Sequence, residues 1–411
     1  MIGNNVVFSN SGVIDAASGT IDFAGGSAVF GGGTQFSGAG VVRVSSNANF
    51  VGGLVSQNLE LAAGNFSGDN TTPAVLGGQV RWTGGSFGGT WQVGSGQTLT
   101  ALDGGDKNFV GTSFTNNGTV VWQSTGRAGL NSSAISNAAL WDLQADADLT
   151  YASGSVSTFS NAGTFRKSAG AGSAVIGNNI VFSNSGVIDA QSGTIDFAGG
   201  SAIFNPGTQF TGAGVVRVSS NANFVGGFTS ANLELAGGSL FGDNTTPAAM
   251  SGQVRWTGGS FGGTWEVGSG QTLTARDGAA KTFVGTAFTN RGTVVWDSTD
   301  QASFISSSVT NAALWDIRAD ANLTYAGGSA STFTNDGTFR KSAGGGSTVV
   351  GNNIVFVNAG TVEAQTGTID FAGGSASFLP GTQFTGAGTV SVSSNASFVG
   401  AFTSANLRLA G

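Results

Sequence analysis

An internal repeat with a period of 174 residues is the feature that most constrains the fold of this chain. The stretch GTIDFAGG occurs at 19–26, at 193–200 and at 367–374. Four tryptophans in the first copy, at 82, 91, 122 and 141, recur in the second at 256, 265, 296 and 315, with no insertion or deletion between them. The chain therefore divides into super-repeats at 1–174 and 175–348 and a partial super-repeat at 349–411. Such a period predicts a stacked array, in which each repeat buries its apolar face against its neighbours.

A shorter period lies inside the long one. The segments TIDF, VVRV, LELA, QVRW, QTLT, TVVW, ALWDL and TFRK follow one another from position 20 before TIDF returns at 194. These eight steps give about 22 residues per step. Each segment alternates apolar and polar residues, which is typical of half-buried strands, and Gly, Asn and Ser between the segments supply turns. No stretch shows the period of a helix.

The two periods together predict an all-β fold, a β-solenoid of the parallel β-helix type with two or three strands per coil. An array of β-sandwich or β-barrel domains is the alternative. That alternative would use hairpins with two-residue turns, for which Asn117-Gly118 is the clearest signal.

The composition fits a solenoid with an apolar core. Glycine is 71 of 411 residues and charged residues are 9%, against about 25% in typical globular proteins, but 30 Phe and 8 Trp require a core. Each tryptophan shares its strand face with aliphatic residues, as Trp82 does with Val80, so we expect core packing rather than exposed rings that stack on sugars. The net charge of −7 with scattered basic residues argues against a nucleic-acid partner. No apolar run is long enough for a membrane-spanning helix.

A second motif marks the corners between strands. It reads Phe or Ile, Ser or Thr, Asn, any residue, then Gly or Ala. It occurs as FSNSG (8–12), FTNNG (114–118), ISNAA (135–139), FSNAG (159–163), FTNRG (288–292) and FTNDG (333–337). We expect the aromatic residue to point inward and the asparagine to lie at the corner, where it tolerates left-handed backbone geometry and bonds nearby backbone groups. Stacked on successive coils, these asparagines would form a ladder.

The aspartate inside each GTIDFAGG stretch is the first candidate for chemistry. Asp22 lies between apolar residues that share the opposite face of the strand, so its side chain should point outward. The same alternation places Arg43, Glu60 and Arg81 outward on the following segments. Opposite charges on neighbouring strands stabilise a sheet, so we interpret Asp22 as a wall residue that helps to set the register, rather than as a catalytic residue or a ligand.

The other two copies support this interpretation of the aspartate. The second copy repeats the column as Asp196, Arg217, Glu234 and Arg255, and the third has Asp370, Ser391 and Arg408. In the third copy an arginine replaces the glutamate where serine has replaced the first arginine. The change avoids like charges on neighbouring coils.

No catalytic, cofactor-binding or metal site is predicted. Almost every acidic residue has a translated twin, which suits a lattice rather than a single cleft, and a chain without histidine lacks the usual general base. Without cysteine it has no disulfide and no cysteine-ligated zinc. The densest charge cluster, Asp103, Asp106 and Lys107, is expected to be an exposed loop, with a weak calcium site as the alternative.

Two further surface features are candidate binding sites. The sequence TLT at 98–100 and 272–274 resembles ice-binding solenoids, but one occurrence per super-repeat makes no threonine grid. The two full copies drift most at 126–135 and 300–309. There an exposed loop either tunes binding or is simply free to drift.

The sequence runs FSNSGVIDAQSGTIDFAGG (182–200), FTNNGTVVW (114–122) and FSNAGTFRKSAG (159–170) resemble repeats of giant bacterial surface proteins, the filamentous-haemagglutinin-like adhesins and autotransporter passenger domains. The resemblance covers the whole chain and implies export, a right-handed β-helix and a stalk or adhesive role. It carries over no functional residue.

We therefore expect a non-enzymatic, structural or adhesive segment of a long extracellular fibre on a bacterial surface. The alternative is a carbohydrate-binding or carbohydrate-cleaving β-helix. The expected partners are neighbouring repeats or chains of the same protein, and host-cell or surface glycans. Met1 aligns with Val175 and Val349, and MIGNNVVF has no signal-peptide features. These observations suggest a piece of a longer array whose cut ends would associate head to tail.

Overall fold

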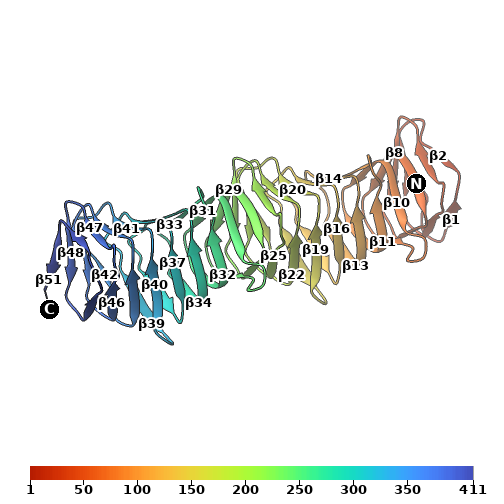
Figure 1. Cartoon of the computed structure of the whole chain (residues 1–411). Coiled ribbons are helices and arrows are strands. Elements are labelled where there is room, and N and C mark those ends of the chain that lie inside the picture. Colours follow the sequence, from red (N-terminus) through yellow and green to blue (C-terminus); the bar gives the residue numbers. More distant parts are fainter. Residues whose placement is uncertain (411) are drawn as a thin grey trace. The chain divides into compact units, whose positions relative to one another are not determined.

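The computed structural model describes residues 1–410, and every regular element in that range is a β-strand. The strands pair in parallel, each with the strand one coil further on, as β3 (Thr20–Phe23) pairs with β6 (Val41–Val44). Three short strands complete one coil, or fewer where a long strand bends across two faces. Figure 1 shows the strands of successive coils lying side by side. The chain is thus a parallel β-solenoid, as predicted, and the sandwich or barrel alternative is wrong. Asn117 and Gly118 form a corner between two faces instead of a hairpin turn.

The coils fall into two compact units, residues 1–203 with 208–216 and residues 204–207 with 217–411. Each unit has three faces, and long strands bend from one face to the next.

In the first unit, the first face holds β1 (Val7–Asn10), β4 (Ser27–Phe30), β7 (Ala48–Phe50), β9 (Asn65–Gly68), the first halves of β11 (Gly85–Val93) and β13 (Lys107–Asn116), β15 (Ala128–Asn131), β18 (Leu149–Ser153), β21 (Ser173–Ile176) and β24 (Thr194–Phe197). The second face holds β2 (Val13–Asp15), β5 (Gln35–Ser37), the first halves of β8 (Gly53–Leu61) and β10 (Ala74–Trp82), the second halves of β11 and β13, β16 (Ala134–Asn137), β19 (Ser157–Asn161) and β22 (Ile180–Asn184). The third face holds β3, β6, the second halves of β8 and β10, β12 (Thr98–Ala101), β14 (Thr119–Trp122), β17 (Leu140–Leu143), β20 (Thr164–Lys167), β23 (Val187–Ala190) and β26 (Gln209–Thr211). The strands β25 (Ser201–Phe204) and β27 (Val215–Val218) lie at the boundary between the units.

In the second unit, one face holds β28 (Ala222–Phe224), β30 (Ser239–Gly242), the first halves of β32 (Gly259–Val267) and β34 (Lys281–Asn290), β36 (Ala302–Ile305), β39 (Leu323–Gly327), β42 (Ser347–Val350), β45 (Thr368–Phe371), β48 (Thr389–Val392) and β51 (Leu407–Leu409). The next holds the first halves of β29 (Gly227–Leu235) and β31 (Ala248–Trp256), the second halves of β32 and β34, β37 (Ser308–Asn311), β40 (Ser331–Asn335), β43 (Ile354–Asn358), β46 (Ser375–Phe378) and β49 (Ala396–Phe398). The last holds the second halves of β29 and β31, β33 (Thr272–Arg276), β35 (Thr293–Asp297), β38 (Leu314–Ile317), β41 (Thr338–Lys341), β44 (Thr361–Ala364), β47 (Gln383–Thr385) and β50 (Thr403–Ser404).

The 174-residue period is not a whole number of coils. The paired positions that start at Ile21 on β3 lead, one coil at a time, to Ile188 on β23. Ile188 lies eight coils after Ile21, so a coil takes about 21 residues. The strand TFRK (β20) therefore pairs with VIDA at 187–190, not with the returning TIDF as the eight-step count implied. Ile195, the copy of Ile21, lies on β24 and the first face. Each super-repeat thus advances by eight coils and one third, and its features reappear on the adjacent face.

Aromatic side chains fill the interior of both units. All eight tryptophans are less than 2% exposed, which confirms their predicted place in the core. Like residues stack on neighbouring coils: the rings of Phe159 and Phe182 lie 5.1 Å apart and nearly parallel, and those of Trp122 and Trp141 lie 6.5 Å apart at 16°. Stacked rings add attraction beyond the burial of their area, so the core favours the same register as the backbone.

The corner asparagines form the ladder that their spacing predicts. The side-chain Nδ2 of Asn116 donates to Oδ1 of Asn137 at 2.7 Å, Asn137 donates to Asn161 at 2.6 Å, and Asn161 donates to Asn184 at 2.6 Å. In the second unit the same chain of bonds joins Asn290, Asn311, Asn335 and Asn358. The left-handed backbone geometry that asparagine tolerates is not used at these residues. Each closes a strand, and the non-glycine residues of the described chain with positive φ are Asn5, Ser132, Asn179, Ser306 and Asn353.

Candidate functional site

The outer charge column lies on one face, as predicted. Asp22 is opposite Arg43, Arg43 is opposite Glu60, and Glu60 is opposite Arg81 on successive strands of the third face. The Glu60 carboxylate lies 3.1 Å from the Arg43 guanidinium and 3.9 Å from that of Arg81. In the second unit, Glu234 lies between Arg217 and Arg255 at 3.3 and 3.9 Å.

The GTIDFAGG aspartate itself has a different partner from the one the column suggested. Oδ1 of Asp22 accepts a hydrogen bond from the Ser45 hydroxyl at 2.6 Å, and Asp370 accepts the same bond from Ser393 at 2.6 Å. The carboxylate therefore ties one coil to the corner of the next. This geometry gives it a role in the wall of the solenoid.

A second ion-paired position lies deeper in the wall. Oδ1 and Oδ2 of Asp142 accept hydrogen bonds from Nε and Nη2 of Arg166 at 3.0 and 2.8 Å, and Asp316 binds Arg340 in the same way at 3.0 Å. Burial alone would raise the pKa of Asp142, but the bonds from Arg166, Gln144 and Ser168 outweigh it and hold that pKa below its usual value. Asp142 is therefore held ionised, which suits a fixed ion pair and not a general acid.

Four lysines are buried at corners, where the sequence analysis did not place them. Lys107 is 2% exposed, and Lys167, Lys281 and Lys341 are fully buried. Asp103 and Asp106 lie in an exposed loop as expected, but Lys107 does not. The signal was present in TFRK, because alternation places Lys167 on the same inward face as Phe165.

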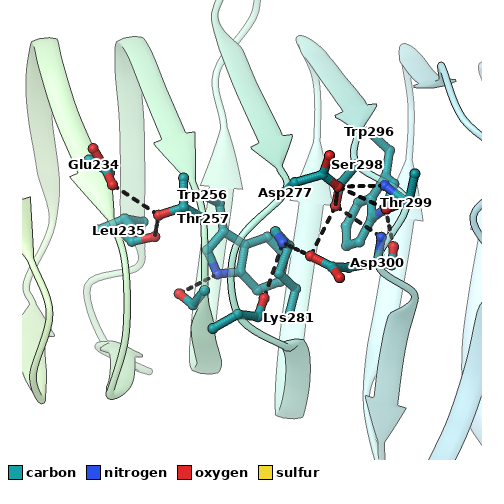
Figure 2. Close-up of polar contacts among 12 residues, drawn as sticks. Glu234, Leu235, Trp256, Thr257, Asp277, Lys281, Trp296, Ser298, Thr299 and Asp300 are labelled. Atoms are coloured by element: carbon teal, nitrogen blue, oxygen red, sulfur yellow. Dashed lines mark hydrogen bonds and ion pairs between the residues drawn. The ribbon is translucent and has the colours of Figure 1, made fainter.

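Each buried ammonium group is held by corner carbonyls and, in three cases, by a carboxylate. Nζ of Lys167 donates to Asp146 at 2.6 Å and to the carbonyls of Ala169 and Gly170. Lys341 repeats the arrangement with Asp320 at 2.6 Å. Figure 2 shows Lys281 beside Asp300, with its Nζ 2.8 Å from Oδ2.

Lys107 lacks the carboxylate that its twin has. Gly126 occupies the position of Asp300, and the Lys107 Nζ donates to the Gly105 carbonyl at 3.1 Å and the Ser124 hydroxyl at 3.4 Å. Burial lowers the pKa of Lys107, opposed by the charges of Asp103 and Asp106. Across residues 1–410 no three acidic side chains are grouped in a way that could hold a metal ion.

The surface of the solenoid has several shallow hollows. Two equivalent open grooves of about 580 and 590 Å³ follow the corners of the asparagine ladders, one beside Arg166 and one beside Arg340. Both arginines are already paired with the buried aspartates. A third hollow, of about 360 Å³, surrounds Phe241 in the second unit and has a mixed apolar and uncharged polar lining.

No family of known proteins, no curated protein and no solved structure matches this chain. In the described range, 1–410, there is also no helix long and apolar enough to cross a membrane.

Proposed function

We propose that this chain is a non-enzymatic shaft segment of a long extracellular fibre on a bacterial surface, structural or adhesive in role. One observation carries the proposal. The backbone ladders and the asparagine ladder join each coil to the next, and the aromatic contacts reach one or two coils along the solenoid. Asn137, for example, accepts from Asn116 and donates to Asn161. Such short-range coupling allows a solenoid to grow by repetition.

The disposition of the charged groups supports a structural role. The least exposed carboxylates, those of Asp142 and Asp316, are both bound by arginine, and the pKa of each is lowered. The buried lysines close corners. Because the pairs Asp142–Arg166 and Asp316–Arg340 recur at equivalent positions in the two super-repeats, they fit a repeated wall better than a single reaction centre.

The bacterial surface and the route of export enter the proposal through the resemblance of the repeats to large surface adhesins. An antibody against this segment should label intact cells of the source organism, and protease added outside the cells should remove the label. Labelling only after lysis would contradict the location.

The shaft role is tested by the length of engineered arrays. One super-repeat spans eight and a third coils, so each added copy should lengthen the particle by about 40 Å at the spacing of adjacent strands, about 4.8 Å. Arrays of two, four and six super-repeats, tagged at both ends, would be measured by electron microscopy. A tag separation that does not grow linearly with copy number would overturn the proposal.

A further inference from the structure

The two full super-repeats differ in one outward-facing column of side chains. In the second copy, Phe241, Gly262, Val284 and Ile305 are direct neighbours on strands β30, β32, β34 and β36. The first copy has Ser67, Gly88, Val110 and Asn131 at these positions. Two polar residues have therefore become apolar on the outer face, where the core gains nothing from the change.

Phe241, the aromatic residue of this column, lies on the surface because another residue fills the inward position beside it. The neighbouring inward position is filled by Leu240, where the first copy has a buried Phe66. Phe241 itself is 41% exposed, as is Val284. A half-exposed phenylalanine beside a half-exposed valine marks a place where a partner would bury apolar surface.

Two glycines form the floor beneath the Phe241 ring. A Cβ atom added to Gly263 would lie 3.0 Å from Cζ of Phe241, and one added to Gly262 would lie 3.3 Å from Cδ2. Side chains at either position would push against the ring. The glycines thus let the ring lie flat along the sheet and leave the hollow beside it open.

The rim of the hollow is polar and carries no charge. Ser239, Asn244 and Ser260 contribute hydroxyl and amide groups to the lining, and none of the lining residues is Asp, Glu, Lys or Arg. The Thr264 hydroxyl donates to Oδ1 of Asn244 at 3.1 Å, which holds the amide in place. An apolar floor inside an uncharged hydrogen-bonding rim matches one face of a pyranose ring, which has C–H groups in its centre and hydroxyls at its edge.

We propose that this hollow binds a neutral pyranose unit of a glycan, with the sugar stacked on Phe241 and its hydroxyls bonded to the rim. A volume of about 360 Å³ lies at the small end of ligand sites, so it suits one or two sugar units. The lining offers no cation to a uronate, sialate or sulfate, so charged glycans are disfavoured. The proposal goes beyond the shaft role and does not depend on it.

The test is calorimetric titration of the full chain with soluble hexaoses of β-1,4-glucose, β-1,3-glucose, α-1,4-glucose and β-1,4-mannose, and with a heparin hexasaccharide as the charged probe. At least one neutral hexaose should bind with one site per chain, and heparin should not. F241S, which restores the residue of the first copy, should weaken that binding about tenfold or more, the magnitude expected for loss of a stacked ring. I305N, also a first-copy residue but outside the hollow, should change the affinity less than twofold.

The reciprocal variant guards against a trivial effect of F241S on folding. S67F places the ring above Gly88 and Gly89 in the first super-repeat and should raise the stoichiometry toward two sites per chain. Binding to none of the neutral probes, binding that F241S leaves unchanged, or preferential binding of heparin would each overturn the proposal. F241S should leave the array-length measurement unaltered, so failure of the glycan site is distinguishable from failure of the shaft.

Discussion

At the scale of single residues, the buried lysines show how a charge can be part of a corner. Lys281 lies inside the solenoid with its ammonium between a backbone carbonyl and Asp300. Its twin Lys107 keeps the carbonyl but has Gly126 in place of the carboxylate. A buried charge that no carboxylate contacts directly is costly, so the first super-repeat carries a weaker corner than the second.

The substitution G126D should strengthen that corner. A Cβ at Gly126 would meet only the Ser124 hydroxyl, at 3.2 Å, and the equivalent Ser298 bonds Asp300 at 3.2 Å. We expect about 1 kcal/mol of added stability against urea at neutral pH, reduced from the full value of a charged hydrogen bond because the carboxylate is partly exposed. The matched variant D300G should lose a similar amount. Equal urea midpoints for G126D and the parent chain would contradict the pairing.

The stability gained through G126D should depend on pH, and the lowered pKa of the equivalent Asp300 gives the direction of that dependence. The hydrogen bond from Lys281 lowers the pKa of Asp300 in the folded chain. A carboxyl with a lowered folded pKa stabilises fully above its unfolded pKa, about 3.9, and loses that stabilisation as the pH falls through the folded value. The difference between G126D and the parent should therefore be full at pH 7 and vanish in strong acid. A difference that persists at pH 2 would indicate a packing effect instead.

At the scale of elements, the asparagine ladder makes the ends of neighbouring strands depend on one another. Asn161 is 1% exposed, accepts from Asn137 and donates to Asn184 and to the Val187 carbonyl. Removing one rung leaves buried polar groups on both neighbours short of a partner. Such networks lose more than the sum of single bonds when interrupted.

The substitution N161A should therefore cost about 2–4 kcal/mol of unfolding free energy, since it removes several buried hydrogen bonds at once. N161D should also destabilise, because a carboxylate accepts from Asn137 but cannot donate to Asn184. N117A is the control: Asn117 lies outside the ladder and is Arg291 in the second copy, so its loss should change stability by less than about 0.5 kcal/mol. Urea titration followed by tryptophan fluorescence measures all three. Similar midpoints for N161A and N117A would refute the ladder as a stabilising element.

Much of this arrangement follows from patterns in the sequence. Period-2 alternation predicts which side of each strand faces the core, including the inward Trp82 and the outward Arg43, and the repeated Asn motif predicts the ladder. The face on which a repeat returns could not be predicted, because coil lengths vary with the corners and only the hydrogen-bonded register shows that Thr164 pairs with Val187. Nor could the hollow at Phe241, since it depends on a shift of register between Gly262 and Gly263.

Each super-repeat is offset from the previous one by one third of a coil. This offset can be tested with engineered disulfides, because the chain has no cysteine of its own. Thr164 and Val187 are direct neighbours on the third face, and adjacent strands at about 4.8 Å fall within disulfide range. T164C with V187C should cross-link under mild oxidation. T164C with T194C should not, since Thr194 belongs to the first face. A cross-link in T164C with T194C but not in T164C with V187C would mean that a super-repeat spans eight whole coils.

At the scale of the whole molecule, the two units are built from the same coils and the same kinds of contact. The packing contacts are short in range along the solenoid: Trp122 contacts Trp141 on the next coil at 6.5 Å and Trp82 two coils back at 5.6 Å. When the coupling reaches only one or two coils, damage is expected to remain local. In a fibre of such coils, local unfolding at one weak coil would leave the other coils folded.

The substitution W122A tests this localisation. Removing a fully buried tryptophan should cost about 3–5 kcal/mol, because it leaves a cavity among Trp82, Trp141 and their neighbours. Hydrogen–deuterium exchange should speed up in the coils around β14 of the first unit, while the coils around Trp296 in the second unit stay protected. W296A should give the mirror image, since Trp296 contacts Trp256 and Trp315 in the same geometry. Faster exchange spread evenly over both units in either variant would mean that the solenoid unfolds as one cooperative block, and that its stability does not accumulate coil by coil as the shaft proposal requires.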